Sequence, residues 1–562
     1  MNTADPVQLE AAKGRWWRAA LALIVVVTVV RVVMVAVLPY ELAADEAQYW
    51  DWSRHFSLAY HTKGPAIAWS IAATTALAGV SEFGVRLGAP LYAGAFVLAL
   101  AALARRIGGG EAGGKAALWA VLLALSIPAY HATALLMTID GPMLACWALA
   151  GLGAYRLHAG AVGGAAGGAV DGERGGWRWG LLFGAALGVG VLFKATILLG
   201  GVGMLAFLWL LRSERKHSVL PGVIAAGVVM AVAVSPMIVW NAQHDWGSVR
   251  HLLGHVGLSG SDLPGGAAKA RGYRLSWTLG YLGALVALAG PVVVVLGVAA
   301  RGALRRKAND AAERAGAVLG VCAALPVLLT YLVVSLFTDV EGNWAIGAWV
   351  ALIPIGGVVA ARAMGEHAAR VRGWLALPAQ ERPRAGILRR RPESVVQVAL
   401  HWGLGYGLVA TAGMCLLGPL SRLPVIGSLV PIERVSGARA LAAEVERVRG
   451  ALGDGAFVVG SKYTTTALLA FYLPGRPTVF CAGSWLGDRR SAYDTLSVTD
   501  LGAVGLLGRD AVLVDHAGRT PVGERWGGAL RFESVEEAAK VGRVAVSVGR
   551  GYVGAVKGGG AR

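Results

Sequence analysis

Long apolar runs separated by short polar segments fill the first three quarters of the chain. A run of roughly 17 to 25 apolar residues is long enough to cross a bilayer as a helix. Such runs lie at 19–38, 84–104, 115–136, 140–157, 179–193, 195–211, 218–240, 278–300, 315–337, 344–361 and 396–418. The pattern therefore predicts an all-α polytopic membrane bundle with about eleven spanning helices. The run 19–38 is too long for a signal-peptide core and has no clear cleavage site before Pro39, so we expect an uncleaved first helix.

The segments between these runs differ in charge, which predicts the side of the membrane on which each one lies. Lys and Arg are concentrated in segments 1–18, 105–106, 156–178, 212–216, 301–307 and 362–391. Because basic loops stay in the cytoplasm, we expect all of these segments to be cytoplasmic. This assignment holds only if the apolar segment 66–80 does not cross the membrane, so we expect it to be an interfacial helix anchored by Trp69. The outer segments are then 39–83, 137–140, the turn at Lys194, 241–277, 338–343 and the tail.

The tail after residue 418 has ordinary polarity and a different periodicity. Helical patterns at 437–452 and 464–473 alternate with strand-like runs at 456–459, 478–481 and 511–514. Strands that alternate with helices indicate a small α/β domain. We therefore expect a cytoplasmic terminus at 1–18, a membrane domain at 19–418 and an extracytoplasmic α/β domain at 419–562.

Composition supports an integral membrane protein and excludes several other classes. Of the 562 residues, 56% are hydrophobic and 15% charged, with a mean hydropathy of +0.58, which is far from the range of soluble domains. The net charge of +18 comes largely from the loops between apolar runs, so it indicates topology and no nucleic-acid partner. The four cysteines stand far apart without a Cys-x-x-Cys pair, which indicates neither a zinc knuckle nor a disulfide framework.

Ionisable residues gather in the segments assigned to the outer face. Two of them interrupt apolar sequence without an adjacent countercharge, namely Asp140 in TIDGPML and Lys194 in LFKATILL. An ionisable group at the membrane boundary is costly unless it is paired or functional. The other residues of these outer segments whose side chains can take part in chemistry are Asp45, Glu46, Asp51, His55, His61, Lys63, His244, Asp245, Arg250, His251, Asp339, Glu341 and Asn343.

These residue types suit transfer from a lipid-linked phosphate. A carboxylate can act as general base towards an acceptor hydroxyl, and Lys and Arg can hold a leaving phosphate. Structural explanations are also open: Asp45 and Glu46 can cap a helix, and Asp140 before Gly141 and Pro142 can start one. Lys63 and Lys194 can extend to lipid headgroups.

The outer histidines raise the question of a metal. His55, His61, His244, His251 and His255 show no H-E-x-x-H or similar ligand spacing. We therefore assign no metal ligands, although a divalent metal stays possible, and no cofactor is indicated with certainty.

Several segments together resemble a known family. They are ADEAQYWDWSRHFSLAYHTKGPAIAWSIAATTALAGVSEFGVRLGAPL, TIDGPML, GVGVLFKATILL, WNAQHDWGSVRHLLGH, EGNWAIGAWVALIP and KYTTTALLAFYLPGRPTVFC. The chain resembles the bacterial membrane glycosyltransferases related to protein O-mannosyltransferases and to the aminoarabinose transferase of lipid A, which is glycosyltransferase family 39 in the broad sense. The resemblance implies the GT-C fold and covers most of the chain.

The resemblance also implies roles for individual residues. Asp45 matches the acidic residue proposed as the catalytic base of the family, with Glu46 beside it, and Asp140 matches a second acidic position, so these three are the catalytic candidates. Lys63 matches the lysine that contacts the lipid phosphate, although Gly64 replaces a proline of the family pattern. Thr62 stands where the aminoarabinose transferases have Glu, which leaves any metal there in doubt. Lys194 matches a recurrent lysine, and Arg250 and Asn343 are further phosphate-binding candidates.

The resemblance implies an inverting transfer of a sugar from a polyprenyl-phosphate carrier, in the cytoplasmic (inner) membrane, with the active site outside. The partners would be the lipid-linked donor, membrane lipid, and a protein, lipid A or cell-wall glycan acceptor. The sequence names neither the sugar nor the acceptor. One alternative is a lipid or solute transporter or flippase, which would favour broken helices and repeated halves. Another alternative is a receptor or structural protein that the helical bundle only anchors in the membrane. A single span would be enough for such an anchor, so the many predicted spans argue against this class.

Overall fold

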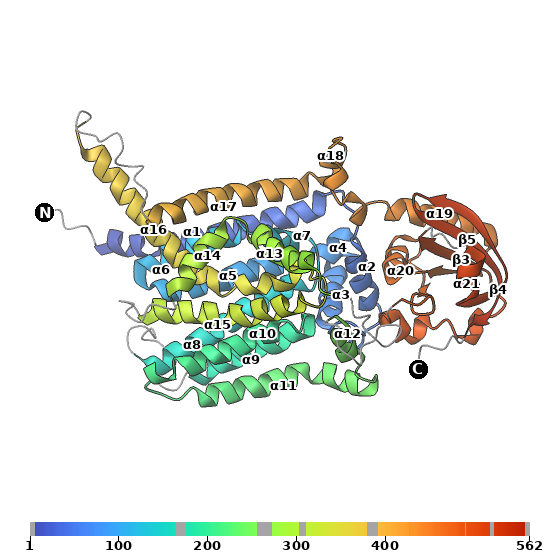
Figure 1. Ribbon diagram of the computed structural model, residues 1–562, viewed down its shortest axis with the longest axis horizontal. Coiled ribbons are helices and arrows are strands. Elements are labelled where there is room, and N and C mark those ends of the chain that lie inside the picture. The colour runs from blue at the N-terminus through green and yellow to red at the C-terminus, as the bar shows by residue number, and fades with distance from the viewer. Residues whose placement is uncertain are drawn as a thin grey trace. The chain divides into compact units, whose positions relative to one another are not determined.

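The computed structural model describes residues 6–163, 176–255, 272–302, 311–378, 392–425, 427–488, 490–516 and 522–556 (Figure 1). The chain divides into two compact units. The first contains Met1–Met34, Ala89–Ser235 and Tyr273–Cys415, and the second contains Val35–Gly88, Pro236–Gly272 and Leu416–Arg562. Two outer segments of the prediction thus form one unit with the tail. The predicted division at residue 418 stays a prediction.

Each predicted span is a helix or a pair of helices. Five helical segments are long and apolar enough to cross a membrane, or up to eight if three bent pairs each count as one span, within the described residues. The bends are 76° between α6 and α7, 98° between α13 and α14, and 57° between η4 and α16. The chain is therefore a multi-pass membrane protein, whereas the count of about eleven spans stays a prediction. The bounds are α1 (Pro6–Val37), α5 (Gly88–Gly108), α6 (Gly110–Ala124), α7 (Pro128–Leu135), α8 (Asp140–Val162), α9 (Gly176–Phe193), α10 (Ile197–Leu210), α11 (Leu220–Gln243), α13 (Leu275–Ala289), α14 (Val292–Arg301), α15 (Ala311–Val334), η4 (Gly342–Trp349), α16 (Leu352–Ala376) and α17 (Pro392–Cys415).

Glycines let two helices of the first unit approach closely. Gly180, Gly184 and Gly188 recur every four residues on α9 and therefore share one face. A Cβ atom on Gly180 would lie 2.0 Å from the carbonyl oxygen of Gly222, and one on Gly184 would lie 2.2 Å from that of Ala226. Both partners belong to α11, so this small-residue face brings the two backbones into contact, as is common between membrane helices.

The second unit contains short helices and a five-stranded sheet. The order of the sheet is β2-β1-β3-β5-β4, with β1 parallel to β2 and β3, and with β5 antiparallel to β3 and β4. The strands at 456–459, 478–481 and 511–514 and the helices at 437–452 and 464–473 are confirmed within a residue or two. The elements are α2 (Ala44–Ser53), α3 (Ala66–Ala78), α4 (Glu82–Arg86), α12 (Gly247–His255), α18 (Leu417–Ser421), α19 (Ala438–Leu452), β1 (Phe457–Gly460), α20 (Tyr463–Tyr472), β2 (Val479–Cys481), β3 (Ala511–His516), α21 (Val522–Gly527), β4 (Leu530–Val541) and β5 (Val544–Ala555).

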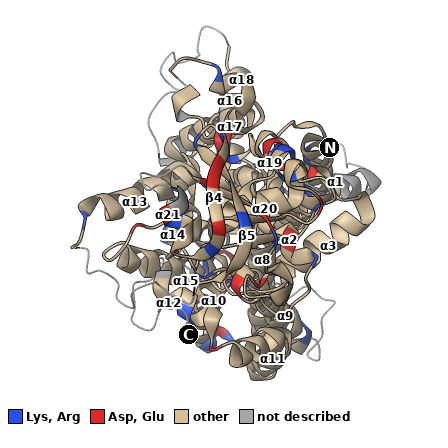
Figure 2. Ribbon diagram, turned by 90° about the vertical axis from the view of Figure 1, so that its right-hand side faces the viewer, with Lys and Arg blue, Asp and Glu red and all other residues tan. Residues whose placement is uncertain are grey.

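The hairpin of β4 and β5 was not predicted. Its first strand carries exposed Glu533, Glu536 and Glu537, which appear as acidic stretches on β4 in Figure 2. Glutamate is uncommon in strands, so local propensity argues against a strand here. The hydrogen bonds to β5 and the burial of Leu530 and Tyr552 in the sheet core stabilise it instead.

We expect Gly184→Ala to destabilise the first unit, because the new Cβ would meet a backbone carbonyl that a side-chain rotation cannot move. Overpacking of this kind costs about 1–3 kcal/mol. The measurement is the thermal unfolding midpoint of the purified protein in detergent. Gly227→Ala on α11 is the matched control, since a Cβ there has nothing within 4 Å. Equal midpoints for the two variants would contradict close packing of α9 on α11.

Candidate active-site residues

Three of the predicted site residues meet in the first unit. Lys194 Nζ lies 2.7 Å from Asp140 Oδ1, and Asn343 Nδ2 donates to Asp140 Oδ2 over 3.1 Å. Asp140 is the first residue of α8, Lys194 follows α9 directly, and Asn343 belongs to η4. The Asp140 and Lys194 side chains are 7% and 14% exposed, so each charge is stabilised mainly by the other. Sequence analysis named all three residues but could not pair them.

Close packing holds the elements of this cluster in place. Trp147 of α8 is fully buried. A Cβ on Gly200 of α10 or on Gly347 of η4 would lie 2.2 Å or 2.6 Å from its indole ring. Next to the cluster, the hydroxyls of Thr196 and Tyr331 lie 3.1 Å apart. Asp140 and Asn343 are therefore carried by elements that pack around one tryptophan, and Lys194 lies in the turn just before a third, α10.

In the second unit, the three acidic residues of α2 lie in different environments. Glu46 and Asp51 are buried, at 0% and 3% exposed, whereas Asp45 is exposed to solvent. Asp51 accepts from Arg54 Nε over 3.0 Å. Burial and the nearby Asp51 carboxylate raise the pKa of the Tyr493 phenol well above its ordinary value, so this phenol stays protonated. Asp45 is thus the one carboxylate among these three that solvent reaches.

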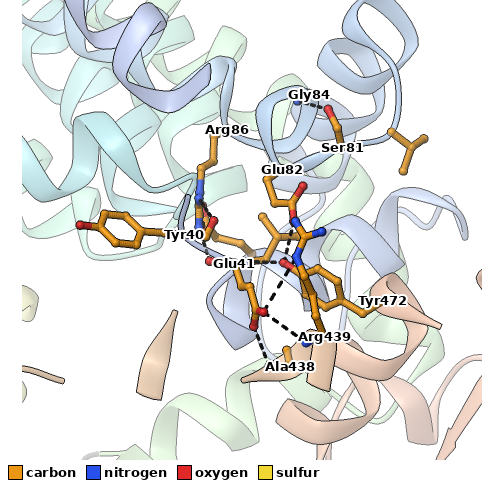
Figure 3. A network of polar contacts seen from close by, with 12 residues as sticks. Tyr40, Glu41, Ser81, Glu82, Gly84, Arg86, Ala438, Arg439 and Tyr472 are labelled. Carbon is orange, nitrogen blue, oxygen red and sulfur yellow. Dashed lines mark hydrogen bonds and ion pairs between the residues drawn. The ribbon is translucent and has the colours of Figure 1, made fainter. Parts of the chain in front are cut away.

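Glu46 is held by a buried arginine that sequence analysis did not assign. Arg86 Nε and Nη2 lie 2.9 Å and 2.7 Å from the two oxygens of Glu46. The same guanidinium donates to the carbonyl oxygens of Tyr40 and Glu41 (Figure 3). Glu46 Oε2 also accepts from the backbone N–H of Ala43 over 3.0 Å, so it caps α2 as one alternative proposed. Glu46 thus pairs with Arg86 and caps α2, and a catalytic role for it stays a prediction.

A second set of contacts ties the start of the outer loop to the tail. The Tyr472 hydroxyl accepts from the backbone N–H of Leu42 over 2.7 Å and donates to Glu82 over 3.1 Å. Arg439 pairs with Glu82, and Glu41 Oε2 accepts from the backbone N–H of Ala438 over 2.6 Å (Figure 3). Burial first, and then the Glu82 and Glu41 carboxylates, raise the pKa of Tyr472, which keeps its hydroxyl available as a donor.

Lys63 and Arg250 come from two segments that contact each other. Lys63 closes a turn with Tyr60, whose backbone groups exchange hydrogen bonds of 2.9 Å and 3.2 Å with it. Ser248 of α12 donates to the Tyr60 carbonyl oxygen over 3.2 Å, and the rings of His251 and His61 are 5.9 Å apart. Lys63 is half-buried and Arg250 is exposed. The helix with Arg250 therefore lies against the turn with Lys63.

No group of three metal ligands exists among the residues that the structure describes. Only His61 and His251 come together among the histidines considered above, and the side chain of His255 lies outside the described residues.

Arg86 was not among the predicted site residues. The feature of the sequence that could have indicated it is a single arginine next to an apolar run. Such a charge predicts a buried partner, but it does not name Glu46, which lies 40 residues away.

Comparisons with known proteins agree with this architecture. Residues 62–240 match the family of dolichyl-phosphate-mannose-protein mannosyltransferases. The chain is similar to the lipid A galacturonosyltransferase RgtD of Rhizobium johnstonii, with 28% identity over 340 residues. That match covers 59% of this chain and 64% of the relative, so this chain spans less than two thirds of the relative's length.

Solved structures show the same fold over nearly the whole chain. ArnT from Cupriavidus metallidurans in the apo state has a TM-score of 0.60 at 16% identity, covering 94% of this chain and 97% of that one. ArnT bound to undecaprenyl phosphate has the same TM-score and identity, covering 95% and 98%.

The fold is therefore the GT-C fold of a multi-pass membrane protein with a small α/β domain. The family match over residues 62–240 and the similarity to RgtD agree with the resemblance to glycosyltransferase family 39 in the broad sense.

We expect Arg86→Leu to destabilise the second unit strongly. The change leaves the Glu46 carboxylate buried without its cation, and breaking a buried pair in this way costs about 3–5 kcal/mol. The thermal unfolding midpoint in detergent measures the effect. Lys115→Ala removes the solvent-exposed pair with Glu111 and should leave the midpoint unchanged. A midpoint for Arg86→Leu equal to wild type would show that the pair does not hold α2.

Proposed function

We propose that this protein is an inverting glycosyltransferase that moves a sugar from a polyprenyl-phosphate carrier to an acceptor hydroxyl. The observation that carries the proposal is the exposed Asp45 at the start of a helix whose other two acids are buried in ion pairs. The GT-C fold and the likeness to RgtD and ArnT support this reaction class.

Asp45 is the general base of this proposal. A base must be accessible to the acceptor, and an exposed carboxylate meets this condition. The buried pair of Glu46 and Arg86 fixes the first turn of α2, and Asp45 immediately precedes Glu46. As Asp45 takes the hydroxyl proton, the acceptor oxygen attacks the anomeric carbon and the bond to the carrier phosphate breaks. Attack opposite to the leaving phosphate inverts that carbon.

Cationic side chains stabilise the phosphate as it leaves. We assign this role first to Lys63 and Arg250, because the two segments that carry them are in contact through Ser248 and Tyr60. Fixed positive groups aimed at a developing charge lower the barrier more than mobile ones do. In the first unit, Asp140 holds Lys194 and Asn343 in a fixed geometry, so we propose a positioning role for Asp140, and phosphate contact by Lys194 and Asn343 stays a prediction.

The cellular setting is part of the proposal. Lys and Arg concentrate in the loops assigned to the cytoplasm, which supports an inner-membrane protein with Asp45 and the tail outside the cytoplasm. A carrier with an isoprenoid tail stays in the bilayer, so its phosphate would be presented at the membrane boundary. The donor is then a polyprenyl-phosphate sugar and requires no nucleotide.

A transporter is the second candidate, because three helix pairs are bent by more than 40°. Broken helices of transporters carry ionisable or unwound polar groups near the middle of the membrane. The sharpest bend, 98° between α13 and α14, falls at Gly290 and Pro291, and 275–300 contains no ionisable side chain except Tyr281. The sharpest bend therefore lacks the charged groups that the broken helices of transporters carry.

We expect Asp45→Asn to abolish sugar transfer without changing the unfolding midpoint, because an amide cannot accept the proton. The assay follows labelled sugar from several polyprenyl-phosphate donors to membrane extract, with the purified protein in liposomes. Asp454→Asn, an exposed acid in the tail, is the control and should keep wild-type turnover. Normal turnover by Asp45→Asn would remove it as the base, and lipid transport without turnover by wild type would favour the transporter.

Lys63→Ala should chiefly weaken use of the donor, because a cation at the leaving phosphate is lost. We expect a KM for the lipid-linked donor that is higher by about tenfold, which corresponds to about 1.4 kcal/mol. Lys63→Arg keeps the charge and should recover part of the loss. A donor KM equal to wild type in Lys63→Ala would count against phosphate contact by this residue.

A further inference from the structure

The tail holds the backbone of segment 38–43, which leads into α2 and is neither helix nor strand. The N–H of Glu41 donates to the carbonyl oxygen of Val435 over 2.9 Å, and the N–H of Leu42 donates to the Tyr472 hydroxyl over 2.7 Å. Asp45, the base proposed above, follows Leu42 by three residues. The two contacts with the tail therefore fix the chain just before the base.

The Glu41 side chain makes a further attachment to the tail. Its Oε2 and Oε1 accept from the backbone N–H groups of Ala438 and Arg439 over 2.6 Å and 3.3 Å. Both N–H groups belong to the first turn of α19, where a helix has free donors and favours a negative charge. The carboxylate thus caps α19, while the backbone of the same residue is bound to Val435.

The Tyr472 hydroxyl closes a ring of contacts around Asp45. It also donates to Glu82 over 3.1 Å, and Glu82 begins α4 (Figure 3). Arg86 ends that helix and pairs with Glu46, the residue directly after Asp45. The ring therefore reaches one side of Asp45 through α4 and the other side through the backbone of segment 38–43.

The far end of α2 is attached to the same part of the tail. Arg54, which directly follows α2, donates through Nη1 to the carbonyl oxygen of Arg476 over 2.8 Å. The rings of Trp50 and Phe471 meet edge to face, with centroids 4.8 Å apart. Residues 471–476 of the tail thus contact both ends of α2, which limits the movement of the helix that carries Asp45.

We infer that the tail is part of the catalytic apparatus, and that Tyr472 is a positioning residue that holds the general base Asp45 in place. The inference rests on the proposed function and assigns a role to the tail. Misplacement by about 1 Å can cost a reaction about a hundredfold in rate, so a catalytic group needs a rigid support. Tyrosine suits this role because its hydroxyl accepts from one segment and donates to another, which phenylalanine cannot do.

The test is Tyr472→Phe in the full-length protein, which removes the hydroxyl and keeps the ring. In the liposome assay with labelled polyprenyl-phosphate sugars, we expect kcat to fall by about tenfold or more and the donor KM to stay unchanged. Hydrogen–deuterium exchange should become faster at residues 41–46, because the Leu42 N–H loses its acceptor. Unchanged stoichiometry of undecaprenyl phosphate binding would show that the fraction of folded protein is the same.

Tyr552→Phe is the matched control. Tyr552 donates to the carbonyl oxygen of Leu501 over 2.8 Å in the core of the tail, so the same deletion weakens the tail itself. This variant should keep the wild-type kcat and the wild-type exchange at residues 41–46. Glu41→Ala removes a different contact of the same segment, and we expect it to lower kcat by about three- to tenfold even if Tyr472→Phe does not fold.

A wild-type kcat in Tyr472→Phe, or unchanged exchange at residues 41–46, would overturn the inference. Equal losses of kcat in Tyr472→Phe and Tyr552→Phe would also overturn it, because the tail would then act only through general stability. Absence of turnover by the wild-type protein would count against the proposed function itself. Exchange at residues 41–46 would in that case still decide whether Tyr472 holds this segment.

Discussion

The buried ion pair of Glu46 and Arg86 is the constraint on which the second unit depends. Neither charge reaches solvent, so each is tolerated only because the other is present and because the remaining donors of Arg86 find the carbonyl oxygens of Tyr40 and Glu41. These contacts fix the chain where it leaves α1 and the first turn of α2. With Glu46 turned inward, the adjacent Asp45 is left at the solvent-exposed side.

The same physical logic separates two classes of carboxylate in this protein. Glu46, Asp51 and Asp140 are buried and paired with cations, so their negative charge is already used to hold structure. Asp45 is exposed and can meet a hydroxyl that arrives from solvent or from the membrane surface. The proposed reaction needs one accessible base, and this division leaves Asp45 as the solvent-exposed carboxylate of α2.

Small residues and aromatic rings set the geometry around these charges. Gly180 and Gly184 bring α9 against α11, and Gly200 and Gly347 leave room for the indole of Trp147. In the second unit, the rings of Trp52 and Tyr60 stack with centroids 4.4 Å apart, and Tyr60 shares a hydrogen-bonded turn with Lys63. Close packing of this kind leaves little freedom to the elements that carry the polar side chains, which is what a preorganised site requires.

The sequence by itself determined the membrane class, the positions of the helices and most strands of the tail, because apolar periodicity and run length are local properties. It also identified Asp140, Lys194 and Asn343 as candidates. Only the tertiary structure decided that these three meet, that Glu46 is buried against Arg86, and that β4 is a strand despite its glutamates. Each of these outcomes depends on a partner far away in the chain, or on a neighbouring strand, which no local pattern can specify.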